Sequence, residues 1–389
     1  MNRIACSSRD LEEQVALQGQ GSYMYKGQTH YPLPVVDLKG RLEHYSDPDV
    51  RTALVQQLRE AGRVGSFCVV NHGIDEKLLM EFKQVCREFF ALPLEEKINC
   101  SKTPIPGCYR PLGYQGQFHN RTQKSFVTQR REVFEIQGSP SSYNHDLVPW
   151  PELLPSFRGC LEAFAKEMQG LTKWMMETLA EGLGLEKDAF LKQIGGDEFH
   201  QQVNVCSYPM MEKQPKEIIN PSTIAFGAHS DLTIMNLVLE DDVGGAQVYH
   251  DDRWFDVKPI PEGVTLFLGD PMECMSNGMY HAMIHRVVAP ENNSRFSCVS
   301  TVEPIDKERT VIHAVPELVE SLGAPAKYVP YNFLGRFMSI AGKRFEPEIM
   351  TKRFMVTDAA VLDSLRDFSV RDGVFHIGSR PLGSFTEGF

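Results

Sequence analysis

The chain has 389 residues, of which 42% are hydrophobic, so it can bury a sizeable core in one large or two ordinary domains. Its formal net charge is −11, and the densest basic spot, Arg130-Arg131, is followed at once by Glu132. A protein that binds phosphate backbones concentrates Lys and Arg, so nucleic acid is not an expected partner.

The N-terminal residues contain no apolar stretch of the signal-peptide kind, and no apolar run approaches the roughly 18 residues of a membrane helix. The 9 cysteines are scattered and lack C-x-x-C spacing, which indicates reduced core residues rather than a disulfide framework. We therefore expect a cytoplasmic protein without a membrane partner.

The N-terminal half alternates strand and helix patterns. Residues 1–32 are polar and without periodicity, which predicts a loose leader. Residues 101–148 are rich in Gly, Pro, Ser and Asn, which predicts loops and short strands. The expected elements are strands at 33–38 and 65–71 and helices at 49–62, 76–90 and 157–183, the second helix being stopped by Pro93.

The pattern changes after residue 200, where eight short β-type runs are separated by turn clusters such as Asp241-Asp-Val-Gly-Gly245. These runs lie at 202–208, 222–229, 233–239, 245–249, 254–258, 263–269, 282–288 and 296–302. They predict a double-stranded β-helix, or jelly roll, which can wrap a central cavity.

We therefore predict a mainly β fold, with a jelly-roll core flanked by N- and C-terminal helices. The last 75 residues are expected to return to helix and to end in an irregular tail, Ile377 to Phe389. The predicted divisions are a leader at 1–32, a helical and mixed region at 33–200, the jelly roll at 201–310, and C-terminal helices and tail at 311–389.

His229-Ser-Asp231 places an imidazole and a carboxylate two positions apart, and alternate side chains of an extended segment share one side. His285 follows in another β-type run, with 53 residues between it and Asp231. Two imidazoles and one carboxylate on adjacent strands can occupy one face of an octahedral iron. The three open positions let such a metal bind a co-substrate and dioxygen together.

Each of these signals is weak when taken singly, because a chain of this composition contains roughly one H-x-D by chance. A second instance, His250-Asp-Asp252, falls in a charged turn and is expected to be a solvated hairpin. His72 precedes a turn, and we expect it to have a structural role.

Arg295-Phe-Ser297 follows His285 on the next expected strand and is the only R-x-S in the chain. A guanidinium forms two parallel hydrogen bonds with a carboxylate, and a nearby hydroxyl adds a third. Since a buried Arg without an acidic partner is costly, we expect its counter-charge to be the distal carboxylate of a metal-chelating dicarboxylate. The alternative is an ordinary surface ion pair of Arg295.

Several longer segments accompany these residues. They read LPVVDL (33–38), GSFCVVNHGI (65–74), EFFALPLEEK (88–97), GAHSDLTIMNLVLEDDVGGAQV (227–248) and LFLGDPMECMSNGMYHAMIHRVV (266–288). In this order they resemble the plant-type 2-oxoglutarate/Fe(II)-dependent dioxygenase family, which includes gibberellin and flavonoid oxidases and has isopenicillin N synthase as a relative. The resemblance covers residues 33–340.

The resemblance implies roles for six residues. CSYP at 206–209 is similar to the family's NYYP strand, although Cys206 and Ser207 stand where the family usually has Asn and Tyr. His281 stands where the family commonly has Lys and is expected at the rim. The implied residues are His229, Asp231 and His285 as iron ligands, and Arg295, Ser297 and Tyr208 as the 2-oxoglutarate carboxylate site.

The implied cofactor and co-substrates are Fe(II), 2-oxoglutarate and O₂, with ascorbate as a stimulant. The implied reaction is hydroxylation, desaturation or oxidative cyclisation of a small organic metabolite, with release of succinate and CO₂. We expect the substrate between the jelly-roll mouth and the loops at 104–136, with the tail at 377–389, including Phe385 and Phe389, as a lid.

Two other functions are open at this point. One is an iron oxidase that does not use 2-oxoglutarate, like the penicillin- and ethylene-forming relatives, in which the Arg-x-Ser pair binds another anion. The other is a non-catalytic ligand-binding protein on the same fold, against which the presence of all three metal residues argues. Stoichiometric succinate formation separates the first from the expected function, and a lack of iron-dependent oxygen uptake would favour the second.

Overall fold

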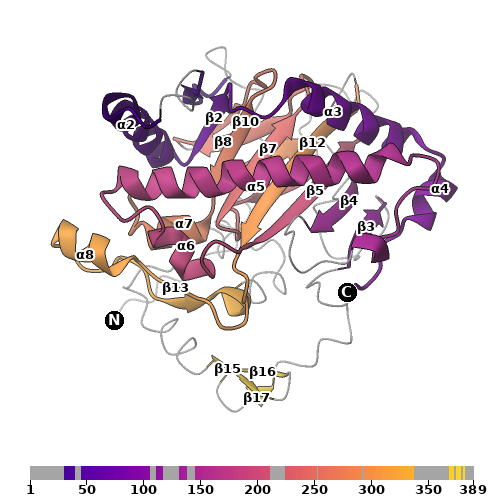
Figure 1. Ribbon diagram of the computed structural model, residues 1–389. Coiled ribbons are helices and arrows are strands. Elements are labelled where there is room, and N and C mark those ends of the chain that lie inside the picture. The colour runs from indigo at the N-terminus through magenta and orange to yellow at the C-terminus, as the bar shows by residue number, and fades with distance from the viewer. Residues whose placement is uncertain are drawn as a thin grey trace.

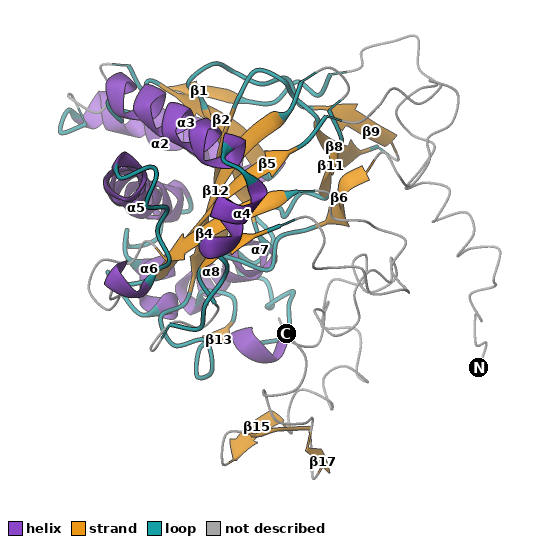
Figure 2. Cartoon of the chain, turned by 90° about the vertical axis from the view of Figure 1, so that its right-hand side faces the viewer, coloured by secondary structure: helices purple, strands orange, loops and turns teal. Residues whose placement is uncertain are grey.

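The described part of the chain is built in three layers. A computed structural model describes residues 30–39, 45–105, 111–116, 131–137, 145–210, 224–251, 253–290 and 293–336, and the backbone of 368–371, 374–377 and 380–381. Figure 2 shows a helical layer, a large central sheet and a smaller sheet on the opposite side. The two sheets enclose the interior of the roll.

The large sheet has eight strands and the small sheet four. In spatial order the large sheet contains β1 (Val35–Asp37), β2 (Ser66–Val70), β10 (Val264–Leu268), β7 (Met235–Glu240), β12 (Arg295–Glu303), β5 (His200–Tyr208), β4 (Glu132–Gln137) and β3 (Gly113–Gln115). The small sheet contains β6 (Ile224–His229), β11 (His285–Val288), β8 (Ala246–His250) and β9 (Arg253–Asp256). All eight strands predicted between 201 and 303 are present, four in each sheet, which confirms the jelly roll.

Period-two alternation gives the two faces of the large sheet different chemistry. On β12, Phe296 and Cys298 face outward into the apolar core shared with the helices. The alternate positions Arg295 and Ser297 are also buried but face the interior of the roll. Arg295 and Ser297 therefore lie between the two sheets.

Three helices cover the outer face of the large sheet: α2 (Pro48–Val64), α3 (Glu76–Ala91) and α5 (Ser156–Gly182). In Figure 1 the long helix α5 crosses this face. Phe82 of α3 stacks on Phe164 of α5 with ring centroids 3.8 Å apart, and meets Phe296 of β12 edge-on at 6.1 Å. Apolar residues recur every three or four positions along these helices, and this spacing made the helices predictable from the sequence.

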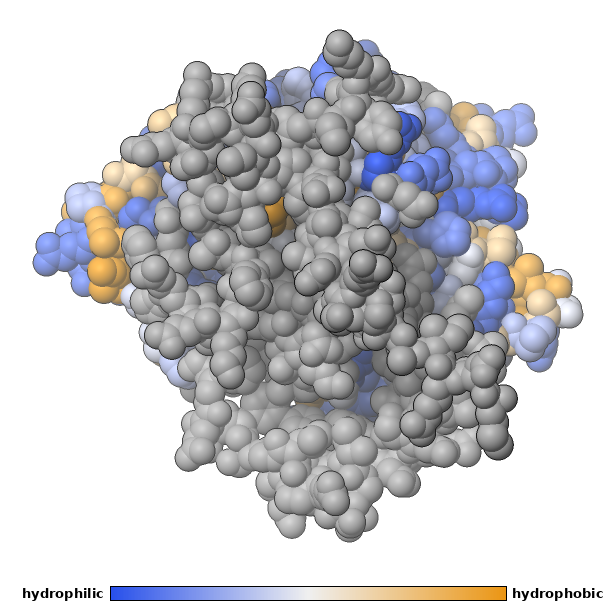
Figure 3. Space-filling view, turned by 180° about the vertical axis from the view of Figure 1, so that it is seen from behind, coloured by the Kyte–Doolittle hydropathy of each residue, from blue (hydrophilic) through white to orange (hydrophobic). Residues whose placement is uncertain are grey.

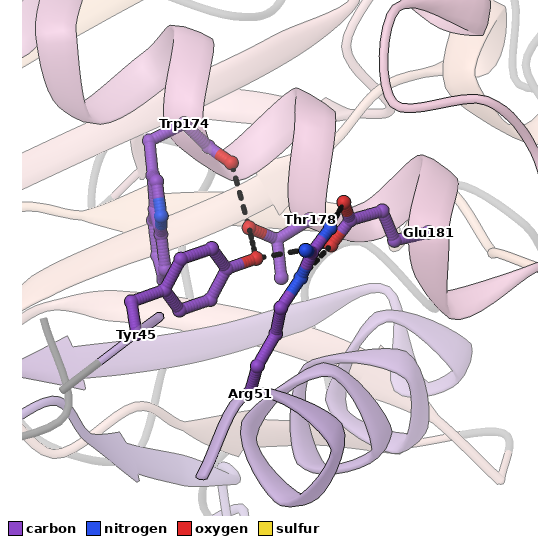
Figure 4. Close-up of polar contacts among 5 residues, drawn as sticks. All are labelled: Tyr45, Arg51, Trp174, Thr178 and Glu181. Atoms are coloured by element: carbon purple, nitrogen blue, oxygen red, sulfur yellow. Dashed lines mark hydrogen bonds and ion pairs between the residues drawn. The ribbon is translucent and has the colours of Figure 1, made fainter. Parts of the chain in front are cut away.

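A polar cluster fastens the start of α2 to α5 (Figure 4). The Tyr45 hydroxyl donates to the Glu181 carboxylate at 3.0 Å, and Arg51 donates to the same carboxylate through Nε at 3.2 Å. The Thr178 hydroxyl lies 3.4 Å from that of Tyr45 and donates to the Trp174 carbonyl at 2.8 Å. These bonds fix the helical layer that supports the sheet.

Short elements complete the described chain. They are α4 (Leu94–Asn99), a 3-10 helix at His145–Leu147, α6 (Ala189–Ile194), α7 (Asp270–Met275), β13 (Val311–Ile312), α8 (Pro316–Leu322) and β14 (Tyr331–Asn332). Large exposed apolar side chains are spread over several elements, including β1, α3, α4 and α8. Figure 3 shows the molecule from behind, where the visible described residues are mostly hydrophilic and the apolar patches are small.

The C-terminal prediction needs correction. Instead of helix followed by an irregular tail, β15 (Phe368–Arg371), β16 (Val374–Ile377) and β17 (Arg380–Pro381) form an antiparallel sheet. Asp372-Gly373 between two runs rich in Val and Phe was the missed signal, because Asp-Gly is a preferred two-residue hairpin turn. Apart from α8 and a helical stretch at 333–336, the expected C-terminal helices lie outside the described residues.

Several other expectations also fall outside the described residues. These are the leader up to residue 29, most of the pocket loops at 104–136, and Phe385 and Phe389 of the expected lid. Within the described residues, the seven cysteines are free and six of them are buried, as predicted. No helix in this part of the chain is both long and apolar enough to span a bilayer.

Candidate metal centre and carboxylate site

The two candidate histidines are direct neighbours in the small sheet. His229 is the last residue of β6 and His285 the first of β11, and the two residues are paired across the antiparallel ladder. Their ring centroids lie 4.3 Å apart. Residues far apart in the sequence thus meet because strands β6 and β11 are hydrogen-bonded to each other.

Asp231 lies two residues beyond His229, the last residue of β6, and a neighbouring turn holds its backbone. The Asp231 carbonyl accepts from the Asp270 amide at 2.8 Å, where β10 turns into α7. Gly269 lies so close to this segment that an added Cβ would be 2.9 Å from the Asp231 carbonyl oxygen and closer still to that of Thr233.

The three side chains converge through their metal-binding atoms. The Asp231 Oδ1 atom is 3.5 Å from His229 Nε2 and 3.7 Å from His285 Nε2, and all three ligand atoms lie within 4.8 Å of one another. Each imidazole uses Nδ1 to donate to a backbone carbonyl, that of Gly227 at 2.7 Å and that of Met283 at 3.0 Å. These bonds fix the tautomer that directs the Nε2 lone pairs toward Asp231, as metal-binding histidines require.

The electrostatics of this cluster suit a cation. Burial, followed by the neighbouring His285, lowers the pKa of His229 well below its ordinary value, so its imidazole is neutral. Burial raises the pKa of the Asp231 carboxyl, and its Oδ2 atom is buried without a hydrogen-bond partner among the described residues. A bound metal ion would supply both the charge and the contact that this carboxylate lacks.

The other histidines singled out in the sequence lie elsewhere. His250 ends β8 with its side chain 48% exposed, 3.5 Å from Asp251, so the solvated hairpin is confirmed. His72 uses both ring nitrogens in backbone contacts, with the Glu262 carbonyl at 2.9 Å and the Ile74 amide at 3.3 Å, as a structural residue would. His281 is exposed, in keeping with a rim position.

The predicted carboxylate site lies on the interior face of the large sheet. Arg295 is paired with Tyr208 across β12 and β5, and Ser297 is paired with Cys206. Arg295 donates to the Ser297 hydroxyl at 3.2 Å, and its guanidinium lies over the Tyr208 ring, 5.0 Å from the centroid. The three predicted residues are therefore brought together.

Arg295 nevertheless has a partner that the sequence reasoning missed. Its guanidinium donates to the Glu240 carboxylate at 2.7 Å, and both side chains are buried. The expectation that Arg295 lacks an acidic protein partner was therefore wrong. The alternative, a surface ion pair, was also wrong, because both side chains are buried. Its Nε is still a buried donor without a partner among the described residues.

Arg131 is a second missed residue. It directly precedes β4, and its guanidinium lies 4.3 Å from the centroid of the Phe226 ring and 3.7 Å from Cys206 Sγ. Burial opposes its charge, but interactions with Cys206 and Tyr208 raise the pKa of Arg131 above its ordinary value. The sequence marked Arg131 only as part of a basic pair, because the register of β4 on β5 is not readable from local composition.

Comparison with known proteins gives consistent matches. The model of the 2OG-Fe(II) oxygenase superfamily matches residues 199–304, and that of the N-terminal region of non-haem dioxygenases in morphine synthesis matches residues 33–155. A flavonol synthase/flavanone 3-hydroxylase of Arabidopsis thaliana is 31% identical over 77% of this chain and 83% of its own length. A leucoanthocyanidin dioxygenase of Perilla frutescens is 28% identical over 77% and 80%.

Solved structures are similar as well. The crystal structure of JOX2 in complex with 2OG, Fe and JA superposes with a TM-score of 0.64 at 27% identity, covering 84% of this chain and 92% of that one.

Proposed function

This chain belongs to the 2OG-Fe(II) oxygenase superfamily, and from that premise we propose that His229, Asp231 and His285 hold its iron. The enzyme is a 2-oxoglutarate/Fe(II)-dependent dioxygenase that oxidises a small metabolite, with O₂ as co-substrate. The observation that carries the assignment of the ligands is the convergence of two Nε2 atoms and one carboxylate oxygen within 4.8 Å. Two imidazoles and a carboxylate are the donor set typical of such Fe(II) oxygenases.

Arg295, Ser297 and Tyr208 are proposed to bind the distal carboxylate of 2-oxoglutarate. The unpartnered Nε of Arg295 is a donor that such a carboxylate can satisfy, and the Ser297 hydroxyl lies beside the guanidinium. Iron bound at the triad supplies the chemistry that couples 2-oxoglutarate decarboxylation to substrate oxidation. The chain's own contribution is to hold both groups in a buried site.

The substrate is proposed to be a small, largely apolar organic molecule. Two aromatic rings flank the triad: Phe226 meets His229 edge-on at 4.5 Å, and Phe267 stacks on His285 at 4.4 Å. Apolar walls of this kind suit ring-containing metabolites. Flavonoid oxidation by the relatives and JA in the JOX2 structure support the same class.

The direct test is succinate release with Fe(II) and 2-oxoglutarate across flavanones, dihydroflavonols and jasmonates. We expect succinate and oxidised product in equal amounts with at least one compound. If no compound in the panel stimulates succinate formation, the proposed substrate class is contradicted.

The iron ligands are tested separately by substitution. His285→Ala removes one of three ligands and should leave a folded protein without bound iron, while His250→Ala, the other H-x-D histidine, should bind iron normally. Metal content after desalting and circular dichroism provide the two measurements. Full iron content in His285→Ala would overturn the assignment.

A further inference from the structure

The buried carboxylate site contains more positive charge than Arg295 alone supplies. Arg295 is matched by Glu240 in a buried ion pair, so this pair alone offers no net charge to an incoming anion. Binding a carboxylate there would leave a buried negative charge in excess, which is strongly unfavourable. A further cation is needed.

Arg131 is placed to provide that charge. Val133 is paired with Cys206 across β4 and β5, and Cys206 with Ser297 across β5 and β12. Two residues before Val133, Arg131 therefore lies on the same interior face, next to Tyr208. Burial lowers the pKa of Arg131. Cys206 and Tyr208 raise it, Tyr208 partly through a side-chain hydrogen bond.

The acids nearest to Arg131 and Arg295 are otherwise engaged. Glu135, on the same face of β4, pairs with Lys102. Asp241 accepts from the backbone amides of Phe296 at 2.6 Å and Val243 at 3.1 Å. Among the described residues, no carboxylate lies within ion-pair distance of Arg131. Asp241 and Glu135 act on Arg295 and Arg131 through longer-range electrostatics, but Glu240 is the only carboxylate in a direct ion pair with either guanidinium among the described residues.

We propose that Arg131 is a further cation of the co-substrate site, supplying the positive charge that Glu240 takes from Arg295. The 2-oxoglutarate carboxylate is then bound by a two-arginine site, with Tyr208 between the two guanidinium groups. This inference rests on the proposed function and adds a residue to the site that it describes.

The experiment measures 2-oxoglutarate binding by calorimetry, with Mn²⁺ in place of iron so that no turnover occurs. Arg131→Gln should raise the Kd for 2-oxoglutarate by about tenfold or more, since a buried carboxylate loses a charged partner. Arg131→Lys, which keeps the charge, should retain most of the affinity. Arg253→Gln is the matched control, because Arg253 also lies 4.3 Å over a phenylalanine ring, Phe255, but on β9.

The decisive variant is the double substitution Arg131→Gln/Glu240→Gln. It frees Arg295 from its ion pair with a carboxylate, and should recover most of the lost affinity. Unchanged 2-oxoglutarate binding in Arg131→Gln would overturn the inference. Weak binding in Arg131→Gln without recovery in the double variant would show a structural role and also overturn it. Wild-type protein that binds no 2-oxoglutarate with Mn²⁺ would instead contradict the proposed function itself.

Discussion

Burial also lowers the pKa of a histidine that lies well outside the metal triad. His200, the first residue of β5, is paired with Glu303 at the far end of β12. Burial, followed by the charge of Lys307, lowers the pKa of His200 from 6.5 to about 4. The folded protein therefore keeps this imidazole neutral where the unfolded chain would protonate it.

This difference makes stability depend on pH. Between pH 6.5 and about 4 the unfolded state binds the extra proton, so the free energy of unfolding falls as the pH drops through this window. Allowing for the partial exposure of the ring, His200 should contribute about 1–2 kcal/mol to this loss. Urea unfolding at pH 7 and pH 4 should show a smaller loss in His200→Gln than in wild type. His250→Gln should retain the wild-type loss, and equal losses in all three proteins would refute the prediction.

The candidate site shows what residue patterns can and cannot reveal. His229, Asp231, His285 and Arg295 could be named because motif spacing and resemblance both single them out. Glu240 could not, because it adjoins the acidic turn that begins at Asp241, whereas in the structure it is the last residue of β7. Its pairing with Arg295 depends on the register of β7 on β12, which is set by tertiary packing.

At the scale of elements, the turn from β10 into α7 positions the carboxylate ligand. Gly269 precedes α7, and its amide donates to the Ile234 carbonyl at 3.0 Å, while the next amide, that of Asp270, donates to Asp231. This close backbone approach leaves no room for a side chain at residue 269. The long helices and the roll's strands were predictable from periodicity, whereas a contact of this kind between two loops was not.

Gly269→Ala should therefore displace the Asp231 segment. We expect a loss of about 1–3 kcal/mol in the free energy of unfolding, together with weaker metal binding. Gly170→Ala is the matched control: an added Cβ meets nothing within 4 Å on α5, so it should be neutral or stabilise by about 0.5–1 kcal/mol. Denaturant unfolding and Mn²⁺ titration measure the two effects. Wild-type metal affinity in Gly269→Ala would show that the turn does not position Asp231.

At the scale of the whole molecule, the proposed ligands join segments that are distant in sequence. The metal triad belongs to the small sheet and to the loop after β6, whereas Arg295, Ser297 and Tyr208 belong to the large sheet. Unfolding separates all of these groups, so the unfolded chain cannot hold either ligand in the same way. Bound metal and bound co-substrate should therefore both raise the free energy of unfolding.

Thermal unfolding tests this linkage. A ligand at one hundred times its Kd adds about 2.7 kcal/mol, so Mn²⁺ should raise the Tm and 2-oxoglutarate should raise it further. Because a dicarboxylate that chelates the metal needs both ends of the site, 2-oxoglutarate should have little effect when EDTA removes the metal. His285→Ala should lose the response to Mn²⁺ and most of the response to 2-oxoglutarate, with His250→Ala behaving as wild type. Equal increases in Tm in His285→Ala and wild type would mean that the stabilising ligands bind elsewhere on the chain.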